Sequence, residues 1–138
     1  MSEGWQTLGA HTFRIELPDI YFLRICGKIS GPDMVQIFES FDHFALDRWY
    51  AFWLIDVSRM AGMTPEGRKL AADQPLNPKN RGMAMIGARL PQRVITTLLV
   101  RATELLKGDV PLLVFCDTEV TARAWLDDRR RQVSKQPF

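Results

Sequence analysis

The sequence predicts a single α/β domain, built on one mixed, mostly parallel sheet of about five strands that about four helices cover. The chain has 138 residues, a length typical of one domain, so we assign residues 1–138 to it, with the core at about 11–131 between short tails. Short apolar runs alternate with amphipathic segments in the order β-β-α-β-α-β-α-β-α. This alternation requires crossovers between parallel strands and leaves one antiparallel strand at an edge.

Two extended runs near the N-terminus predict an antiparallel hairpin. Residues Thr12–Leu17 alternate apolar and polar side chains, which is typical of a half-solvated strand near a sheet edge. Pro18 and Asp19 supply a turn, and Ile20–Ile29 is rich in aromatic and β-branched residues. Residues Ser30–Asp33 then favour the start of a first helix, whose apolar positions recur at helical spacing: Met34, Ile37, Phe38 and Phe41.

The middle of the chain predicts the central strand and a short helix. Residues Tyr50–Val57 are apolar on both faces, as in a buried parallel strand, and we place this strand at the centre of the sheet. A capping hydroxyl, a proline and an acid at Thr64–Glu66 predict a second helix that continues to Ala72. Gly82–Ala88 reads as the next buried strand, in which Gly87 suggests a close backbone approach.

The C-terminal third predicts two helices and one strand. An apolar stripe that ends at Gly108 indicates a third helix over Pro91–Gly108. Leu112–Cys116 reads as the fifth strand, and Asp117 or Thr118 caps a last helix. That helix turns three apolar residues inward: Ala122, Trp125 and Leu126.

Composition excludes several classes of protein. No apolar run approaches the ~20 residues of a transmembrane helix, and no signal-peptide pattern opens the chain, so we expect a cytoplasmic protein. The net charge of +2 gives no general attraction to nucleic acid. Cys26 and Cys116 are far apart in apolar stretches, which favours buried free thiols over a disulfide or zinc site.

Four stretches together resemble the STAS superfamily, which includes the anti-sigma-factor antagonists. They are, in order along the chain, Gly27–Pro32, Trp53–Ser58, Ala84–Gly87 and Ala124–Leu126. The resemblance covers about Phe13–Leu126. Within the superfamily, the chain looks most like the stand-alone bacterial branch, which is related to both STAS and CRAL-TRIO lipid-transfer domains. It implies a non-catalytic regulatory domain that binds a protein partner through the loop and helix after the third strand.

In anti-sigma-factor antagonists a serine in that loop accepts phosphate from a partner kinase. Asp56 and Ser58 match the Asp-x-Ser of these proteins, but the phosphorylated serine lies further on, where this chain has Ala61 and Gly62. The resemblance therefore leaves Thr64 and Ser58 as the candidate phospho-acceptors. Thr64 has an alternative role, because a helix N-cap explains the same Thr-Pro-Glu sequence.

Polar residues that follow the parallel strands form a candidate binding rim, because ligands of open α/β sheets gather beyond the carboxyl ends of the strands. The rim and its loop comprise Asp56, Ser58, Arg59, Thr64, Glu66, Arg89 and Asp117. The alternative is local and structural: Ser58 bonds the turn, Asp56 caps nearby amides and Asp117 caps the last helix.

Catalysis has little support in the sequence. No histidine is placed by a motif to activate Ser58, and no nucleophile elbow or phosphate loop surrounds it. His11 and His43 are isolated, so we expect neither a metal nor a cofactor. The alternative to protein binding is a small apolar molecule or lipid held beside methionine- and aromatic-rich helices, although a chain of this length has little spare core for a cavity.

Two further surfaces have alternative readings. Arg129–Arg131, with Arg123 and Lys135, forms a basic tail that suits phosphate groups of nucleic acid or lipid, but also an ordinary solvated helix end, which we favour. Trp5, Trp49 and Tyr50 lie near element ends. If these aromatic residues are exposed together, they favour a homodimer.

Overall fold

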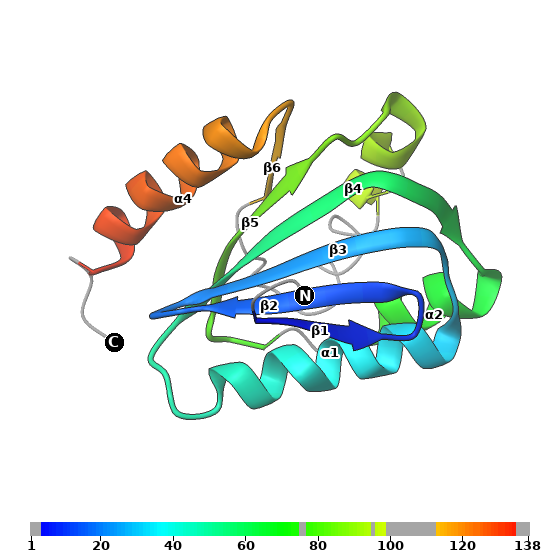
Figure 1. Ribbon diagram of the computed structural model, residues 1–138, viewed down its shortest axis with the longest axis horizontal. Coiled ribbons are helices and arrows are strands. Elements are labelled where there is room, and N and C mark those ends of the chain that lie inside the picture. Colours follow the sequence, from blue (N-terminus) through cyan, green and yellow to red (C-terminus); the bar gives the residue numbers. More distant parts are fainter. Residues whose placement is uncertain (1–3, 75–76, 95, 99–112, 135–138) are drawn as a thin grey trace.

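The computed structural model describes residues 4–74, 77–94, 96–98 and 113–134, and they form one six-stranded sheet (Figure 1). The strands lie side by side in chain order: β1 (Trp5–Leu8), β2 (His11–Glu16), β3 (Ile20–Ile29), β4 (Ala51–Met63), β5 (Asn80–Ile86) and β6 (Leu113–Cys116). β1, β2 and β3 pair antiparallel, whereas β3, β4, β5 and β6 pair parallel. The mixed, mostly parallel α/β sheet expected from the sequence is confirmed, with one strand more.

The helices lie on both faces of this sheet. α1 (Gly31–Ala45) and α2 (Pro65–Asp73) lie on one face and α4 (Glu119–Ser134) on the other (Figure 1). α1 begins with the predicted capping box, in which the Ser30 and Asp33 side chains each accept a hydrogen bond from the other's backbone N–H at 3.1 Å. Of the helix expected over Pro91–Gly108, residues 91–94 and 96–98 are helical, and the rest of it lies outside the described residues.

The strand at the edge of the sheet differs from our expectation. Thr12–Leu17 was expected near an edge, but β1 pairs with β2 from Trp5 opposite Arg14 to Leu8 opposite His11. β1 is short and two of its four side chains are exposed, so the sequence pattern is too weak to predict it. Gly9, with φ of +64°, makes the turn between the two strands.

The central strand is longer than predicted. β4 does not end at Val57 but continues to Met63, which lies opposite Ile29 of β3. The pairing of β4 with β5 ends at Asp56, which lies opposite Ile86. The last residues of β4 therefore pair with β3 alone, and the segment predicted as a loop is mostly strand.

Side chains alternate between two apolar clusters, one on each face of the sheet. Tyr21, Leu23, Trp53 and Ile55 point toward α1, whereas their neighbours Phe22 and Leu54 point toward α4. This period of two follows from the pleat of the strands. The two faces of the sheet are consequently packed by different helices. None of the described helices is long and apolar enough to cross a membrane.

Candidate functional site

Asp56 and Ser58 lie at the carboxyl end of the β4–β5 pair, as predicted, but they bind each other. The Asp56 Oδ1 atom accepts hydrogen bonds from the Ser58 backbone N–H at 2.9 Å and from the Ser58 Oγ at 2.7 Å. Gly87 lies against this turn, and a Cβ added to it would come within 2.9 Å of the Ser58 Cβ. The close approach expected at Gly87 is thus present, and Ser58 and Asp56 have the local roles that the sequence left open.

The other predicted rim residues surround this turn without converging on it. The Arg89 guanidinium donates to the Met60 carbonyl at 3.1 Å, and Arg59 is exposed. Asp117 is almost fully exposed and receives a long, 3.4 Å hydrogen bond from Arg93. The cap of the last helix is Thr118, whose hydroxyl accepts from the Thr121 N–H, and not Asp117.

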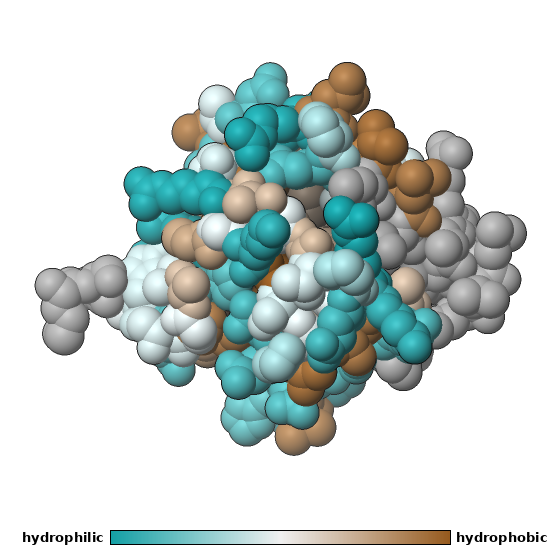
Figure 2. Space-filling model, turned by 90° about the vertical axis from the view of Figure 1, so that its right-hand side faces the viewer, coloured by the Kyte–Doolittle hydropathy of each residue, from teal (hydrophilic) through white to brown (hydrophobic). Residues whose placement is uncertain are grey.

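Thr64 and Glu66 lie apart from the other rim residues, at the start of α2. Thr64 caps this helix, because its Oγ1 accepts a hydrogen bond from the Gly67 N–H at 3.0 Å. The Thr64 backbone N–H donates to the Ile29 carbonyl, and the Glu66 side chain lies over Gly31 at the start of α1. Figure 2 looks onto the end of the molecule where α2 lies, and its described surface is mixed, with hydrophilic side chains over the centre and hydrophobic ones gathered at the upper right.

Two side chains with catalytic potential, His11 and Cys116, are buried. His11 is fully buried, with Nδ1 accepting from the Cys26 N–H at 3.0 Å and Nε2 lying 3.2 Å from Asp33. Burial raises the pKa of the Cys116 thiol, which disfavours the nucleophilic thiolate. Within the described residues no three His, Cys, Asp or Glu side chains are grouped to hold a metal ion.

The basic tail is tied to the body of the protein. Arg129 donates to the Arg81 carbonyl at 2.8 Å, and Arg131 pairs with Asp128. The Nε and Nη2 atoms of Arg130 each donate to the Asp19 carboxylate at 2.7 Å. Arg123 binds the Glu16 carboxylate with two hydrogen bonds of 2.7 and 2.9 Å. These internal partners favour the helix-end reading over a phosphate-binding tail; Lys135 lies outside the described residues.

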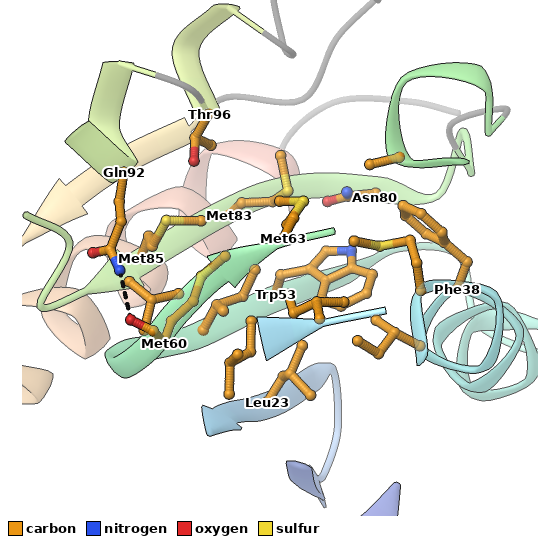
Figure 3. A pocket seen from close by; sticks show the side chains of 17 residues that line it. Leu23, Phe38, Trp53, Met60, Met63, Asn80, Met83, Met85, Gln92 and Thr96 are labelled. Atoms are coloured by element: carbon orange, nitrogen blue, oxygen red, sulfur yellow. Dashed lines mark hydrogen bonds between the residues drawn. The ribbon is translucent and has the colours of Figure 1, made fainter. Parts of the chain in front are cut away.

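An apolar pocket lies between the sheet and the helices on the α1 face, and the rim residues do not line it (Figure 3). It has a volume of about 170 Å³. Its lining comes from β3, β4, β5, α1, α2 and two helical residues, Gln92 and Thr96, and includes Met34, Met60, Met63, Met83 and Met85, five of the six methionines in the chain. Flexible methionines adapt to different shapes, which is typical of adaptable binding surfaces.

The polar side chains of the pocket are few. Gln92 closes one side, where its Nε2 donates to the Met60 carbonyl at 3.1 Å and its Oε1 accepts from the Arg89 N–H. Asn80 and Thr96 also face the pocket. The sequence signals for a pocket were the resemblance to domains related to lipid-transfer folds and helices rich in methionine and aromatic residues, whereas four of the five methionines that line the pocket are on strands.

Comparisons with known proteins identify the fold. No protein-family model matches the chain, and no curated protein sequence does. A solved structure that is similar is an uncharacterized protein of the DUF3478 family, with a SpoIIAA-like fold, from Shewanella loihica PV-4. It has 17% identity and a TM-score of 0.57, over 85% of this chain and 92% of that one. The anti-sigma factor antagonist SpoIIAA, in its unphosphorylated form, is similar at 13% identity and a TM-score of 0.56, over 86% and 98%.

The chain has a SpoIIAA-like fold. The STAS-like architecture expected from the four sequence stretches is therefore confirmed. At these identities the likeness concerns the fold, and the function of a SpoIIAA-like domain has to be argued from the site itself.

Proposed function

We propose that this SpoIIAA-like domain is a non-catalytic binding domain whose site is the apolar pocket. The observation that carries the proposal is a partly open apolar pocket of about 170 Å³, lined mainly by buried apolar side chains. Binding sites for small molecules are typically concave and lined mostly by apolar side chains, with a few polar groups that orient the ligand. A small apolar molecule would bury apolar surface against this lining.

This proposal reverses the order of the two binding functions expected from the sequence. Protein binding ranked first there because of the resemblance to anti-sigma-factor antagonists, and a small apolar ligand ranked second because a chain of this length was expected to have little spare core for a cavity. The pocket supports the second function, and Ser58, Asp56 and Thr64 each have a local hydrogen-bond partner. The occupied Ser58 hydroxyl and the buried His11 ring support a role without catalysis.

Native mass spectrometry of protein purified without denaturation tests the pocket. We expect a retained small molecule, and we expect Ala71→Leu to abolish retention because Ala71 lines the pocket from α2. Ala72→Leu is the matched control, since the neighbouring Ala72 does not line it. If neither wild type nor the control retains a ligand, or if Ala71→Leu retains it fully, the pocket is not the site.

Binding of a protein partner is the second candidate, and one observation favours it. Among the described residues, no strand pairs with β4 beyond Asp56 on its β5 side, and exposed charges lie along this segment at Arg59 and on α2 at Glu66. The Met60 carbonyl of this segment already accepts from Arg89 and Gln92, so an extended segment of another protein could pair only with the remaining backbone groups. The similar structure named as an anti-sigma factor antagonist supports this candidate. The test is affinity capture from host lysate: a partner lost from both Arg59→Glu and Glu66→Arg supports it, and unchanged capture opposes it.

Three expectations remain proposals. A phosphate on Thr64 or Ser58 would appear as added mass in protein purified from its own host, and its absence would remove this form of regulation.

A homodimer is supported by exposed Trp49, although Trp5 and Tyr50 are half-buried, and sedimentation analysis would test it. The free thiols of Cys26 and Cys116 support a reducing, cytoplasmic location, which fractionation of host cells would test.

A further inference from the structure

We infer that the pocket selects a small neutral molecule that carries a hydrogen-bond acceptor, and that Asn80 and Trp53 recognise this acceptor. The inference rests on the proposed binding function of the pocket. It goes beyond that function because it names the class of ligand and the residues that discriminate it.

Asn80 places an unused donor at the wall of the pocket. It is only 7% exposed, and its Oδ1 accepts from the Gly82 N–H at 3.3 Å, which fixes the oxygen end of the amide. No described residue accepts a hydrogen bond from the Asn80 Nδ2, and the side chain extends from β5 into the pocket (Figure 3). An amide donor at the pocket wall that no described residue engages can donate to an acceptor on a ligand, which adds the net free energy of one hydrogen bond.

Trp53 adds a second donor on the same face of the sheet. Asn80 lies opposite Ala51 in the β4–β5 pairing, two residues before Trp53, so both side chains leave the same face. The indole is 5% exposed and fixed by Phe41, which stacks on it with ring centroids 4.4 Å apart. Its nitrogen lies on the side of the ring toward Asn80 and has no acceptor among the described residues (Figure 3).

Charge and volume limit the ligand further. Among the described residues that line the pocket, none is Asp, Glu, Lys, Arg or His. A charged ligand would lose its hydration there without gaining an opposite charge, so the pocket favours a neutral molecule. A volume of about 170 Å³ suits a molecule about the size of one aromatic ring with a short substituent and is small for a long acyl chain.

Three molecules of nearly the same shape test the inference on the full-length, unmodified chain. Acetophenone is neutral and has a carbonyl acceptor, α-methylstyrene replaces that oxygen by carbon, and benzoate carries a charge. We expect acetophenone to bind about two- to tenfold more tightly than α-methylstyrene, the effect of one net hydrogen bond. Benzoate should bind more weakly than either. Titrations followed by ¹⁵N NMR should shift the side-chain signals of Asn80 and Trp53.

The outcomes separate this inference from the proposed function. Equal binding of acetophenone and α-methylstyrene would overturn the acceptor inference and leave the apolar pocket standing. Tighter binding of benzoate would overturn the neutral-ligand part. Failure of all three to bind would oppose the pocket function as well.

A variant assigns the preference to Asn80. In Asn80→Leu we expect α-methylstyrene to bind as before or better, and the ratio of the two dissociation constants to fall to about one. Asn77→Leu is the control, because Asn77 is near in sequence but does not line the pocket. An unchanged ratio in Asn80→Leu would overturn the assignment. If that variant does not fold, the same ratio measured in Trp53→Phe tests the second donor, and the wild-type comparison still decides the inference.

Discussion

Arg130 of α4 holds the carboxylate of Asp19, in the turn between β2 and β3, with two hydrogen bonds of 2.7 Å. Asp19 is only 3% exposed, and its backbone carbonyl accepts from the Phe52 N–H of β4 at 2.8 Å. Asp19 therefore connects the last helix, the hairpin turn and the central strand.

Removing the arginine should leave a buried carboxylate without its partner. We expect Arg130→Met to lower the free energy of unfolding by about 3 kcal/mol, measured by chemical denaturation. Arg131→Met is the control, since Arg131 pairs with Asp128 and both side chains are about two-thirds exposed. That change should cost less than about 1 kcal/mol. Equal losses in the two variants would show that the ion pair with Asp19 is not the cause.

The stability of the fold should depend on pH through Glu16. Hydrogen bonds from Arg123 lower the pKa of Glu16 below its ordinary value of 4.5, although burial opposes them. Because the folded pKa is below the unfolded one, the stabilisation is complete above about pH 4.5 and is lost as the pH falls through the folded pKa. We expect Glu16→Gln to flatten the loss of stability in this acidic range. Glu39→Gln, which removes an exposed carboxylate of α1, is the control for the substitution itself.

Tyr21 should titrate at the other end of the pH range. Burial raises the pKa of Tyr21 to about 12. Here the folded pKa exceeds the unfolded one, so stability is full below about pH 10 and is lost as the pH rises toward 12. Ultraviolet titration of the two tyrosines should show one late transition, absent from Tyr21→Phe and present in Tyr50→Phe. A single transition near pH 10 in the folded protein would contradict this expectation.

Gly87 and Gly27 have the same φ of +75° but different surroundings. Nothing lies within 4 Å of a Cβ at Gly27, whereas a Cβ at Gly87 would come within 2.9 Å of the Ser58 Cβ. We expect Gly27→Ala to cost about 1–2 kcal/mol, from backbone strain alone. Gly87→Ala should cost about 1–3 kcal/mol more, because it also overpacks the turn. Adding Ser58→Gly should recover part of that excess; no recovery would mean that the contact is unimportant.

The Thr64 cap can be separated from any role as a phospho-acceptor. We expect Thr64→Ala to lower the free energy of unfolding by about 1 kcal/mol, because the Gly67 N–H loses its acceptor. Thr64→Ser keeps a hydroxyl at the cap and should retain most of the stability. A loss in Thr64→Ser as large as in Thr64→Ala would assign the effect to packing of the threonine methyl group instead.

Most of the fold could be predicted because its signals are local. The Ser30 cap, the alternation of Thr12–Leu17 and the apolar run Tyr50–Val57 each act over a few residues. The end of β4 could not be predicted, because Ser58–Met63 is held as a strand by pairing with β3, which is distant in sequence. The short β1 likewise depends on its partner β2.

The candidate site was harder to predict than the fold. Asp56 lies at the carboxyl end of the β4–β5 pair, as the strand order predicted, but Thr64 and Glu66 lie at the start of α2, and the bond of Ser58 to Asp56 depends on local geometry that the sequence does not specify. The pocket is a property of how the sheet and helices fit together, and no spacing of residues along the chain specifies a void. Asn80 illustrates this. From the sequence, a single asparagine before an apolar strand looks like a turn residue, but its pairing with Ala51 places its side chain in the pocket wall.

The separation of the two apolar clusters by the sheet has a practical consequence. The proposed ligand site and the ion pairs of α4 lie on opposite sides of the same six strands: the pocket faces α1, whereas the Arg130–Asp19 and Arg123–Glu16 ion pairs join α4 to the hairpin. Substitutions more than about 7–10 Å apart without shared partners usually add independently. Substitutions that stabilise the packing of α4 can therefore be combined with substitutions that reshape the pocket. The first set should offset the loss of folding stability that the second set causes.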